Sequence, residues 1–496
     1  MGNEIFHDTQ ELRRIADLLA EEIKGQDRVV SRYIRVSQES VTFVNGKNAG
    51  GRVWHSGINK EGMADKVYTQ TSVDELRHDN FPEVAVSRDL QKHRFNFSLK
   101  GAELPAGEAE FIETIPPETE MYDKEFQEFT RTHKNTRIRR EFFVEQKVIV
   151  NSRGGRTIQS LPFFEIGYSH SYDPLKLERN LRVVCASRED ARRLIDLIKF
   201  MPDPTPDKRI KNARSFSEAF HELHMLSKLG FGSLEDAGIP IAGLYDIVML
   251  NGFPAHEIFG HHFEEPIRFL EFGESATFKH NQELRNKNIV LMDNPQQEIG
   301  GFKVQGFTYI DAYGRRRQAR THIKDGRVME FLGSEYCDPE GLMKYLGVEK
   351  SRFVGQASQY LDQTFPQPRM SCTVLDGKTE NVDLEGQILI VPCGGHTDPD
   401  DKTYTVVANE CYVIRNGEAI RVVPLKVTGG INQALENVTL LNDLNYNIGA
   451  CEKKDPLYPK IESNVPVSQV VRSQIWRGQQ AYPLAISEDD AKVLTR

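Results

Sequence analysis

The stretch "HEIFGHHFEE" (256–265) places three histidines and three glutamates within ten positions, a composition typical of metal sites. Zinc-protease helices carry two histidines four residues apart, so that one turn brings both onto one face. Here His261 follows His256 by five positions, and on a regular α-helix the two side chains would differ by about 140°. A π-bulge realigns an i, i+5 pair, and Gly260 is the residue that would tolerate one. The spacing therefore predicts a bulged helix that presents His256 and His261 to one ion.

The residues around these histidines include candidates for a general base and for a third metal ligand. Glu257 is adjacent to the first histidine and has the position of a general base. His262 would face away from the ion under either helix geometry. A third ligand is missing locally, and Glu264, Glu265 or a distant thiolate could supply it. A polar helix face without metal is the alternative interpretation of the same residues.

Composition excludes several classes of protein. The chain has 496 residues, enough for two or three domains, with 39% hydrophobic and 27% charged residues, as in ordinary soluble proteins. No apolar run approaches the roughly 20 residues of a membrane helix, and the first thirty residues lack a secretory signal, so we expect a cytoplasmic protein with no membrane partner. The net charge of −9 argues against nucleic-acid binding. Six cysteines without a CxxC pair indicate reduced thiols.

Local patterns predict an α+β fold in two domains. An opening helix with an Asp8 cap is followed by β-rich segments up to about residue 165, and "PDPTPDKR" (202–209) is typical of a linker. We therefore expect a mixed N-terminal domain with helices over 1–205. The remainder, 206–496, is expected to be a C-terminal domain of antiparallel β-sheet that carries the metal-site helix. Its hairpin signals are Asp325-Gly326, Asp376-Gly377 and Asn416-Gly417.

Four segments of the C-terminal half resemble the TldD/PmbA family of metallopeptidases. "GLYDIVMLNGFPAHEIFGHHFEE" (243–265) is similar to the family signature HExxxH, with glycine before the second histidine. "FPQPRMSCTVLDG" (365–377) and "NECYVIRNGEAIRVVPLKVTGG" (409–430) follow in the family's order. "NIGACEKKDPLYPKIESNVPVSQVV" (447–471) is similar to the segment that carries the family's third zinc ligand. The resemblance therefore implies that Cys451 is that ligand.

The resemblance implies a zinc-dependent peptidase in which His256, His261 and Cys451 hold Zn²⁺. Three protein ligands leave a position for a water molecule, whose pKa zinc lowers to about 7, and Glu257 would take its proton. Short or unfolded peptides are the expected substrates, and a homodimer or a heterodimer with a related subunit is the expected assembly. Arg369, in "PQPRM", is a candidate donor to the substrate's carbonyl or carboxylate.

The alternative function is a non-catalytic binding or assembly subunit with a structural zinc or no metal. A structural zinc site is closed by four protein ligands. Cys393 or His396, in "CGGH", is the candidate for such a fourth ligand.

Overall fold

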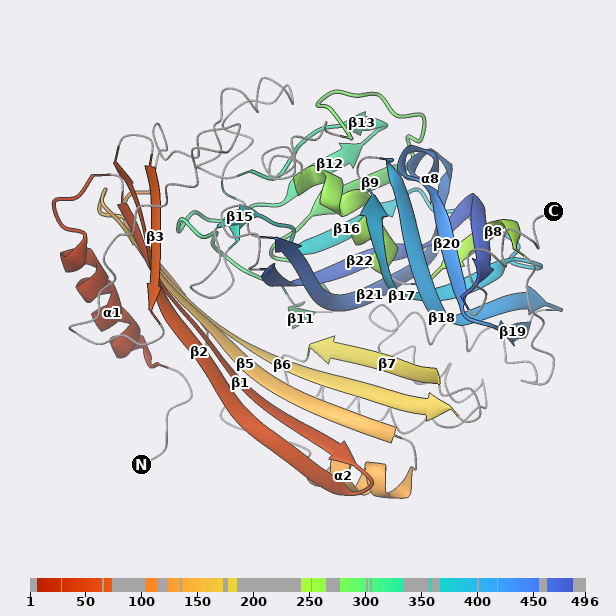
Figure 1. Ribbon diagram of the computed structural model, residues 1–496, viewed down its shortest axis with the longest axis horizontal. Helices are drawn as coiled ribbons and strands as arrows, with labels where there is room; N and C mark the ends of the chain where they lie inside the picture. Colours follow the sequence, from red (N-terminus) through yellow and green to blue (C-terminus); the bar gives the residue numbers. More distant parts are fainter. Residues whose placement is uncertain are drawn as a thin grey trace.

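The computed structural model describes most of both halves of the chain. The described residues are 7–27, 29–64, 67–73, 104–113, 123–133, 136–172, 177–184, 242–250, 252–264, 277–299, 302–303, 306–333, 355, 357–358, 366–398, 401–416, 418–454 and 462–484. The predicted domain boundary at 205/206 and the linker at 202–209 lie outside these residues. Over the described residues the fold is mixed helix and strand and consists mostly of sheet (Figure 1).

A long curved sheet forms the N-terminal part, and two helices lie against it (Figure 1). Its strand order is β3-β2-β1-β5-β6-β4, with β7 paired to β6. The elements are α1 (Thr9–Glu22), β1 (Val29–Val44), β2 (Lys47–Ala64), β3 (Val67–Val73), β4 (Glu108–Ile112), α2 (Asp123–Thr132), β5 (Thr136–Asn151), β6 (Arg156–Tyr172) and β7 (Leu177–Val184). The side chain of Asp8 accepts a hydrogen bond from the backbone N–H of Glu11, as the sequence predicts, and so caps α1. The apolar stripe Leu12, Ile15 and Leu19 then packs on the sheet.

A second, eleven-stranded sheet forms the C-terminal part. Its strand order is β13-β12-β9-β16-β22-β20-β18-β17-β8, with β19 on β18 and β21 on β22. The elements are β8 (Gly243–Met249), β9 (Ile289–Asp293), β12 (Arg320–Lys324), β13 (Arg327–Val328), β16 (Cys372–Gly377), β17 (Ile388–Asp398), β18 (Thr403–Arg415), β19 (Glu418–Val422), β20 (Leu425–Gly430), α8 (Ile431–Asn437), β21 (Val438–Lys454) and β22 (Glu462–Pro483). Two short pairs lie outside it: β10 (Glu298–Ile299) with β11 (Phe302–Lys303), and β14 (Ala357–Ser358) with β15 (Gln367–Pro368). Most pairings are antiparallel, while β16–β22 and β17–β8 are parallel.

The long strand β22 organises this sheet. It pairs with β16, β20, β21 and β8, and the β22–β8 pairing closes a ring through β20, β18 and β17. Trp476 of β22 lies fully buried in the main apolar core, where its ring stacks on Phe259 with the ring centroids 5.1 Å apart. Phe259 belongs to the metal-motif segment, so this contact fixes the segment on the sheet.

Two of the three predicted hairpins are present. Asp325 and Gly326, both at positive φ, join β12 to β13, and Asn416 lies in the turn between β18 and β19. The prediction for Asp376-Gly377 is wrong, because both residues belong to β16 and pair with β9. A Cβ on Gly377 would lie 2.0 Å from the backbone oxygen of Asn288. This glycine therefore permits close approach between strands rather than a turn.

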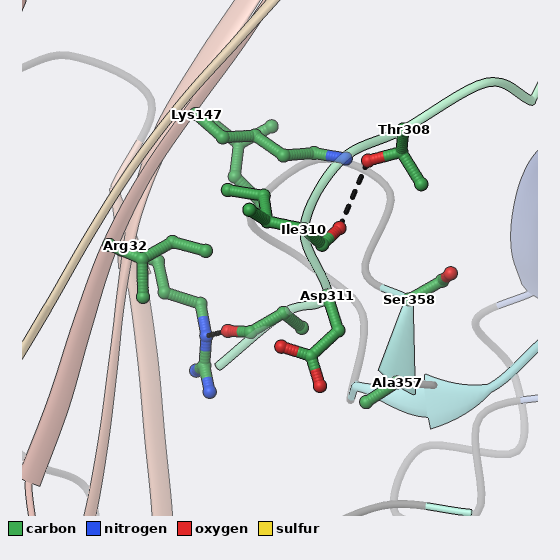
Figure 2. A pocket seen from close by; sticks show the side chains of 10 residues that line it. Arg32, Lys147, Thr308, Ile310, Asp311, Ala357 and Ser358 are labelled. Atoms are coloured by element: carbon green, nitrogen blue, oxygen red, sulfur yellow. Dashed lines mark hydrogen bonds between the residues drawn. The ribbon is translucent and has the colours of Figure 1, made fainter. Parts of the chain in front are cut away.

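A small cavity lies at the junction between strands β1 and β5 of the N-terminal sheet and the segments 308–312 and 357–358 of the C-terminal part (Figure 2). Its volume of about 20 Å³ leaves room for about one water molecule. Arg32 of β1 donates through Nε to the carbonyl of Ala312 across this junction, and its guanidinium lies 4.7 Å from the ring centroid of Tyr313. Asp311 also lines the cavity. The junction is thus held by polar contacts around a buried carboxylate.

No helix in the part of the chain that the structure describes is both long and apolar enough to cross a membrane.

Candidate metal centre

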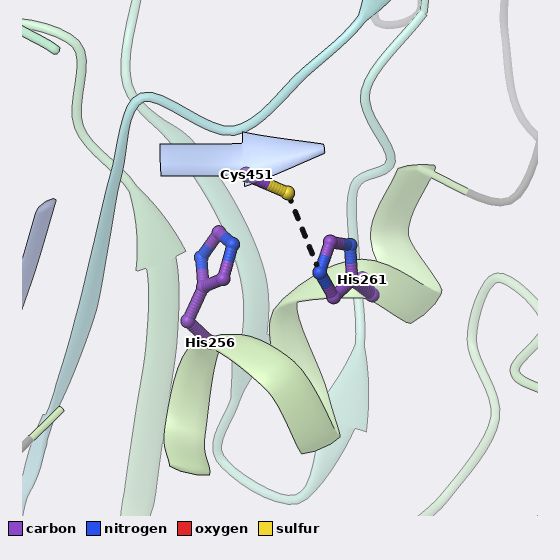
Figure 3. Close-up of side chains that lie close together, drawn as sticks. All are labelled: His256, His261 and Cys451. Atoms are coloured by element: carbon purple, nitrogen blue, oxygen red, sulfur yellow. Dashed lines mark hydrogen bonds between the residues drawn. The ribbon is translucent and has the colours of Figure 1, made fainter. Parts of the chain in front are cut away.

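The metal-motif segment forms two unusual helical turns. A π-helical turn, η3 (Ala255–Phe259), runs directly into a 3₁₀ turn, η4 (Gly260–Glu264). The N–H of Gly260 bonds the carbonyls of both Ala255 and His256, so the helix widens there. The π-bulge that the five-residue spacing predicted is therefore confirmed. It brings the rings of His256 and His261 to a centroid distance of 4.8 Å (Figure 3).

Gly260 has a different role from the predicted one. Its φ of −61° is ordinary helical geometry, so the bulge does not require a glycine for its backbone angles. A Cβ at this position would instead lie 2.5 Å from the sulfur of Met370 and 3.4 Å from the hydroxyl of Thr373. Gly260 therefore allows the helical turn to pack tightly against the segment 370–373.

Cys451 reaches the two histidines from strand β21. The ligand atoms of His256, His261 and Cys451 all lie within 4.8 Å of one another, and all three residues are buried. Sγ of Cys451 is 3.5 Å from Nε2 of His261 (Figure 3). The register of β21 on β22, with Cys451 opposite Val465, sets this position. Residues separated by 190 positions in sequence are thus brought together.

Electrostatics favour a thiolate at Cys451. Burial alone would raise the pKa of this thiol, but the positive charges of Arg369 and His261 outweigh burial and lower the pKa well below its usual value. Burial likewise opposes the charged form of His261, yet the negative charges of Cys451 and Glu257 raise the pKa of the imidazole well above its usual value. A low-pKa thiolate beside an imidazole is the form of cysteine that binds metal.

The donor set fits a zinc ion. Two imidazoles and one thiolate are ligands that zinc commonly accepts. Nε2 of His256 is buried and has no hydrogen-bond partner among the described residues. A buried polar atom without a partner is costly unless a ligand satisfies it. The three residues therefore fit a metal ion as a ligand set.

No fourth ligand joins this set within the described part of the chain. Cys393 and His396 lie on β17 and are both exposed, away from the three buried ligands. The fourth-ligand candidates of the structural-zinc alternative are therefore not brought to the cluster. Three protein ligands are the number found in catalytic zinc sites.

Glu257 lies at the edge of the cluster. One of its carboxylate oxygens is 3.3 Å from Nε2 of His261, and its side chain is 16% exposed. Among the described residues, Glu257 is more exposed than the two other charged neighbours of the cluster, Glu264 and Arg369, whose side chains have no exposed area. A base in this position can reach both the cluster and the solvent side.

The other acidic and histidine candidates have different environments. Glu264 is fully buried and accepts a hydrogen bond from the N–H of Met370 at 2.7 Å. Its second oxygen is 3.2 Å from Nδ1 of His261, the ring nitrogen remote from Cys451. His262 is buried elsewhere, 2.9 Å from the hydroxyl of Thr277. Glu265 lies outside the described residues.

Arg369 lies behind the cluster. Its side chain has no exposed area, and Nη2 donates to the backbone carbonyl of Cys451 at 2.7 Å. Nε is 3.5 Å from the carboxylate of Glu264. The substrate-binding role of Arg369 stays a prediction, and in the structure its charge acts on Cys451 and Glu264.

Sequence reasoning missed Thr373. Its hydroxyl is 2.7 Å from Nδ1 of His256. Thr373 lies in the segment "FPQPRMSCTVLDG" (365–377), and the resemblance of this segment implies no role for the threonine. A threonine in a β-strand carries no further signal of such a contact, so only the pairing of β16 in the sheet could have revealed it.

Comparison with known proteins relates the C-terminal half of the chain to a metallopeptidase family. Residues 244–465 match the family model described as the PmbA/TldA metallopeptidase C-terminal domain. A curated protein of Archaeoglobus fulgidus named "Metalloprotease" is 28% identical over 245 residues, 47% of this chain and 54% of the relative. The chain therefore matches about half the length of that relative.

Solved structures show a shared fold. TldE from Thermococcus kodakarensis superposes with a TM-score of 0.57 at 12% identity, covering 95% of this chain and 99% of that one. A candidate modulator of a DNA gyrase from Thermotoga maritima gives 0.59 at 14% identity, covering 96% and 100%. At these identities the likeness concerns the fold alone.

Proposed function

This chain belongs through residues 244–465 to the TldD/PmbA family, and from this premise we propose that it is a zinc-dependent metallopeptidase acting on short or unfolded peptides. The observation that carries the proposal is the convergence of two imidazoles and one thiolate, without a fourth protein ligand in the described residues. A named metalloprotease among the relatives supports the reaction class.

His256, His261 and Cys451 would hold the zinc ion. When bound, zinc supplies a Lewis acid and lowers the pKa of a coordinated water towards about 7. Glu257 accepts the proton of the attacking water and delivers it to the leaving amine, a role that its position beside His261 permits. Arg369, as the neighbouring positive charge, keeps Cys451 in the thiolate form that binds metal.

We also propose that the active form pairs with another subunit, either a second copy or a related chain. This proposal rests on the resemblance to the TldD/PmbA family, which implies a dimer. The assembly can be measured by the mass of the purified protein in solution.

The test is to measure zinc content and peptide hydrolysis for the wild type and Glu257→Gln. We expect about one zinc per chain in both proteins, because Glu257 is not a member of the ligand cluster. Hydrolysis should fall by at least about 100-fold in the variant, as expected for loss of a general base. Glu283→Gln, the same change at an exposed glutamate, is the control and should match the wild type. Peptide cleavage by Glu257→Gln at the wild-type rate would overturn the mechanism.

A further inference from the structure

Each predicted histidine ligand is contacted on its rear nitrogen by one side chain. Nδ1 of His261 lies 3.2 Å from the carboxylate of Glu264, and Nδ1 of His256 lies 2.7 Å from the hydroxyl of Thr373. All four of these residues are buried. A neutral imidazole carries its proton on one nitrogen only and binds metal through the other. Whatever fixes the proton on Nδ1 therefore decides whether Nε2 can bind.

Glu264 can only accept hydrogen bonds at this position. Its Oε1 receives the N–H of Met370 at 2.7 Å and faces Nε of Arg369 at 3.5 Å. A carboxylate paired with a guanidinium is an acceptor without a proton to give. Oε2 therefore requires that Nδ1 of His261 be the donor, which leaves the lone pair of Nε2 directed at Cys451.

Thr373 has the same effect on the other histidine. Its hydroxyl can donate towards the sulfur of Met370, 3.7 Å away, and so is free to accept from Nδ1 of His256. Thr373 lies on β16 between β9 and β22, so its position is fixed by sheet pairing on both sides. Met370 thus links the two contacts, with its backbone N–H at Glu264 and its sulfur at Thr373.

We propose that Glu264 and Thr373 are positioning residues that fix the tautomer of the two histidines, so that both Nε2 atoms meet Cys451 as metal ligands. This inference rests on the proposed zinc site. Groups that accept a hydrogen bond from a ligating histidine orient the ring and raise its basicity, and their loss typically weakens metal binding by about 10–100-fold.

The discriminating change is Glu264→Gln, which keeps the shape of the side chain. An amide offers one acceptor oxygen and one donor nitrogen. If the oxygen serves Met370 N–H, the amide NH₂ faces Nδ1 of His261, which must then accept. The imidazole proton moves to Nε2, the atom needed for zinc. Zinc affinity, measured by chelator competition, should fall by about 10–100-fold.

Thr373 offers a matched pair of variants. Thr373→Val removes the hydroxyl at nearly constant volume, whereas Thr373→Ser retains it. We expect weaker zinc binding in the valine variant and near wild-type binding in the serine variant. The visible absorption of the Co²⁺-loaded proteins gives a second readout, because loss of one nitrogen ligand changes the ligand-field bands while Cys451 still supplies its thiolate band. A merely structural defect would lower the unfolding temperature of the metal-free protein without this spectral change.

The outcomes separate this inference from the proposed function. Zinc affinities and Co²⁺ spectra equal to wild type in Glu264→Gln and Thr373→Val would overturn the positioning role, whatever the peptidase activity. A wild type that binds zinc tightly but cleaves no peptide would overturn the proposed function and leave the positioning role intact. If Glu264→Gln does not fold, the valine and serine pair at Thr373 decides the question alone.

Discussion

At the scale of single residues, the centre combines a buried thiolate with two imidazoles of different environment. His261 lies between Cys451 and Glu257, both negative, while His256 faces Thr373. The charge of Arg369 lowers the pKa of Cys451 from behind. The negative charges of Cys451 and Glu257 therefore already lie where a divalent cation would be stabilised.

Replacing Cys451 by alanine should remove most of the zinc. The thiolate is one of only three ligands in the described cluster. Loss of a side chain that hydrogen-bonds a zinc-binding histidine weakens zinc binding by about 10–100-fold. Because Cys451 would be a ligand itself, we expect its loss to weaken zinc binding by at least about 100-fold. Cys411→Ala is the control for removing a buried cysteine, and Cys393→Ala for an exposed one. Both controls should keep about one zinc per chain by metal analysis. Full occupancy in Cys451→Ala would assign the third ligand to another residue.

Individual site residues could be predicted from the sequence only where they stand together in a recognisable motif. His256, Glu257 and His261 stand together in one motif, and the structure places them together. Cys451 was reached through a resemblance, because no spacing rule connects it to that motif. In the sequence, Glu264 is a candidate third ligand. Only its contacts with Met370 and Arg369 show that it lies behind the imidazole of His261.

At the scale of elements, the spacing of the motif was informative because helix geometry is nearly fixed. Two ligands five positions apart can share an ion only if the helix widens, and η3 does so. The position of a glycine in the sequence is less informative about local structure. Gly377 has the sequence signature of a hairpin yet lies within β16, where its missing side chain lets Asn288 approach. Local sequence cannot distinguish a turn from a close strand contact, because both favour glycine.

Gly260→Ala should destabilise both the fold and the metal site. The added methyl would meet the sulfur of Met370 at 2.5 Å, and such overpacking costs about 1–3 kcal/mol. Relief of the clash must move Met370 or the turn that carries His261, so zinc affinity should fall as well. Urea unfolding and chelator competition measure the two effects. Gly394→Ala, at a glycine with open space and no positive φ, should leave both unchanged, and equal behaviour of the two variants would refute the packing argument.

At the scale of the whole molecule, long-range strand pairing builds the centre. Strand β22 contacts four other strands and supports β21, which carries Cys451, and β16, which carries Thr373. The sequence predicted a sheet-rich C-terminal half, but it contains no signal for the order or register of these strands. That information resides in side-chain packing between segments up to hundreds of residues apart, as between β8 and β22.

The buried Asp311, which lines the cavity beside strands β1 and β5, should make the free energy of unfolding depend on pH. Burial raises the pKa of Asp311 to about 6, although hydrogen bonds from Arg315 and Tyr313 oppose this shift. An unfolded aspartate has a pKa near 3.9, so ionisation is disfavoured only in the folded state. The resulting loss of stability is absent below about pH 4, grows as pH rises to about 6 and is constant above. From the difference of about two pKa units it amounts to on the order of 3 kcal/mol.

Asp311→Asn removes this ionisation while its amide oxygen can still accept the two backbone hydrogen bonds at Tyr313 and Arg315. Urea unfolding should show the variant to be more stable than wild type at pH 7–8 and nearly equal to it at pH 4. Asp325→Asn, at an exposed turn position, provides the control and should show no such trend. A constant difference between wild type and Asp311→Asn across pH 4–8 would exclude the ionisation of Asp311 as its origin.

In the proposed peptidase, the burial of the centre would restrict which substrates reach it. His256, His261 and Cys451 are only 3%, 9% and 6% exposed, so the scissile peptide bond must enter the protein to reach them. A flexible, extended chain can do so, whereas a packed domain would have to unfold locally at a cost of several kcal/mol. We therefore expect cleavage of unfolded chains and sparing of folded ones.

The measurement compares a disulfide-bonded protein in its folded form with the same protein after reduction and alkylation of its cysteines, at equal concentration. The reduced form should be degraded while the folded form stays intact, and Glu257→Gln should leave both untouched, which excludes a contaminating protease. Extended chains bind to proteins largely through backbone hydrogen bonds, so fragments should arise from many positions in the reduced chain. Equal degradation of both forms by the wild type would mean that the centre accepts folded surfaces. The low exposure of the three ligands would then not control access.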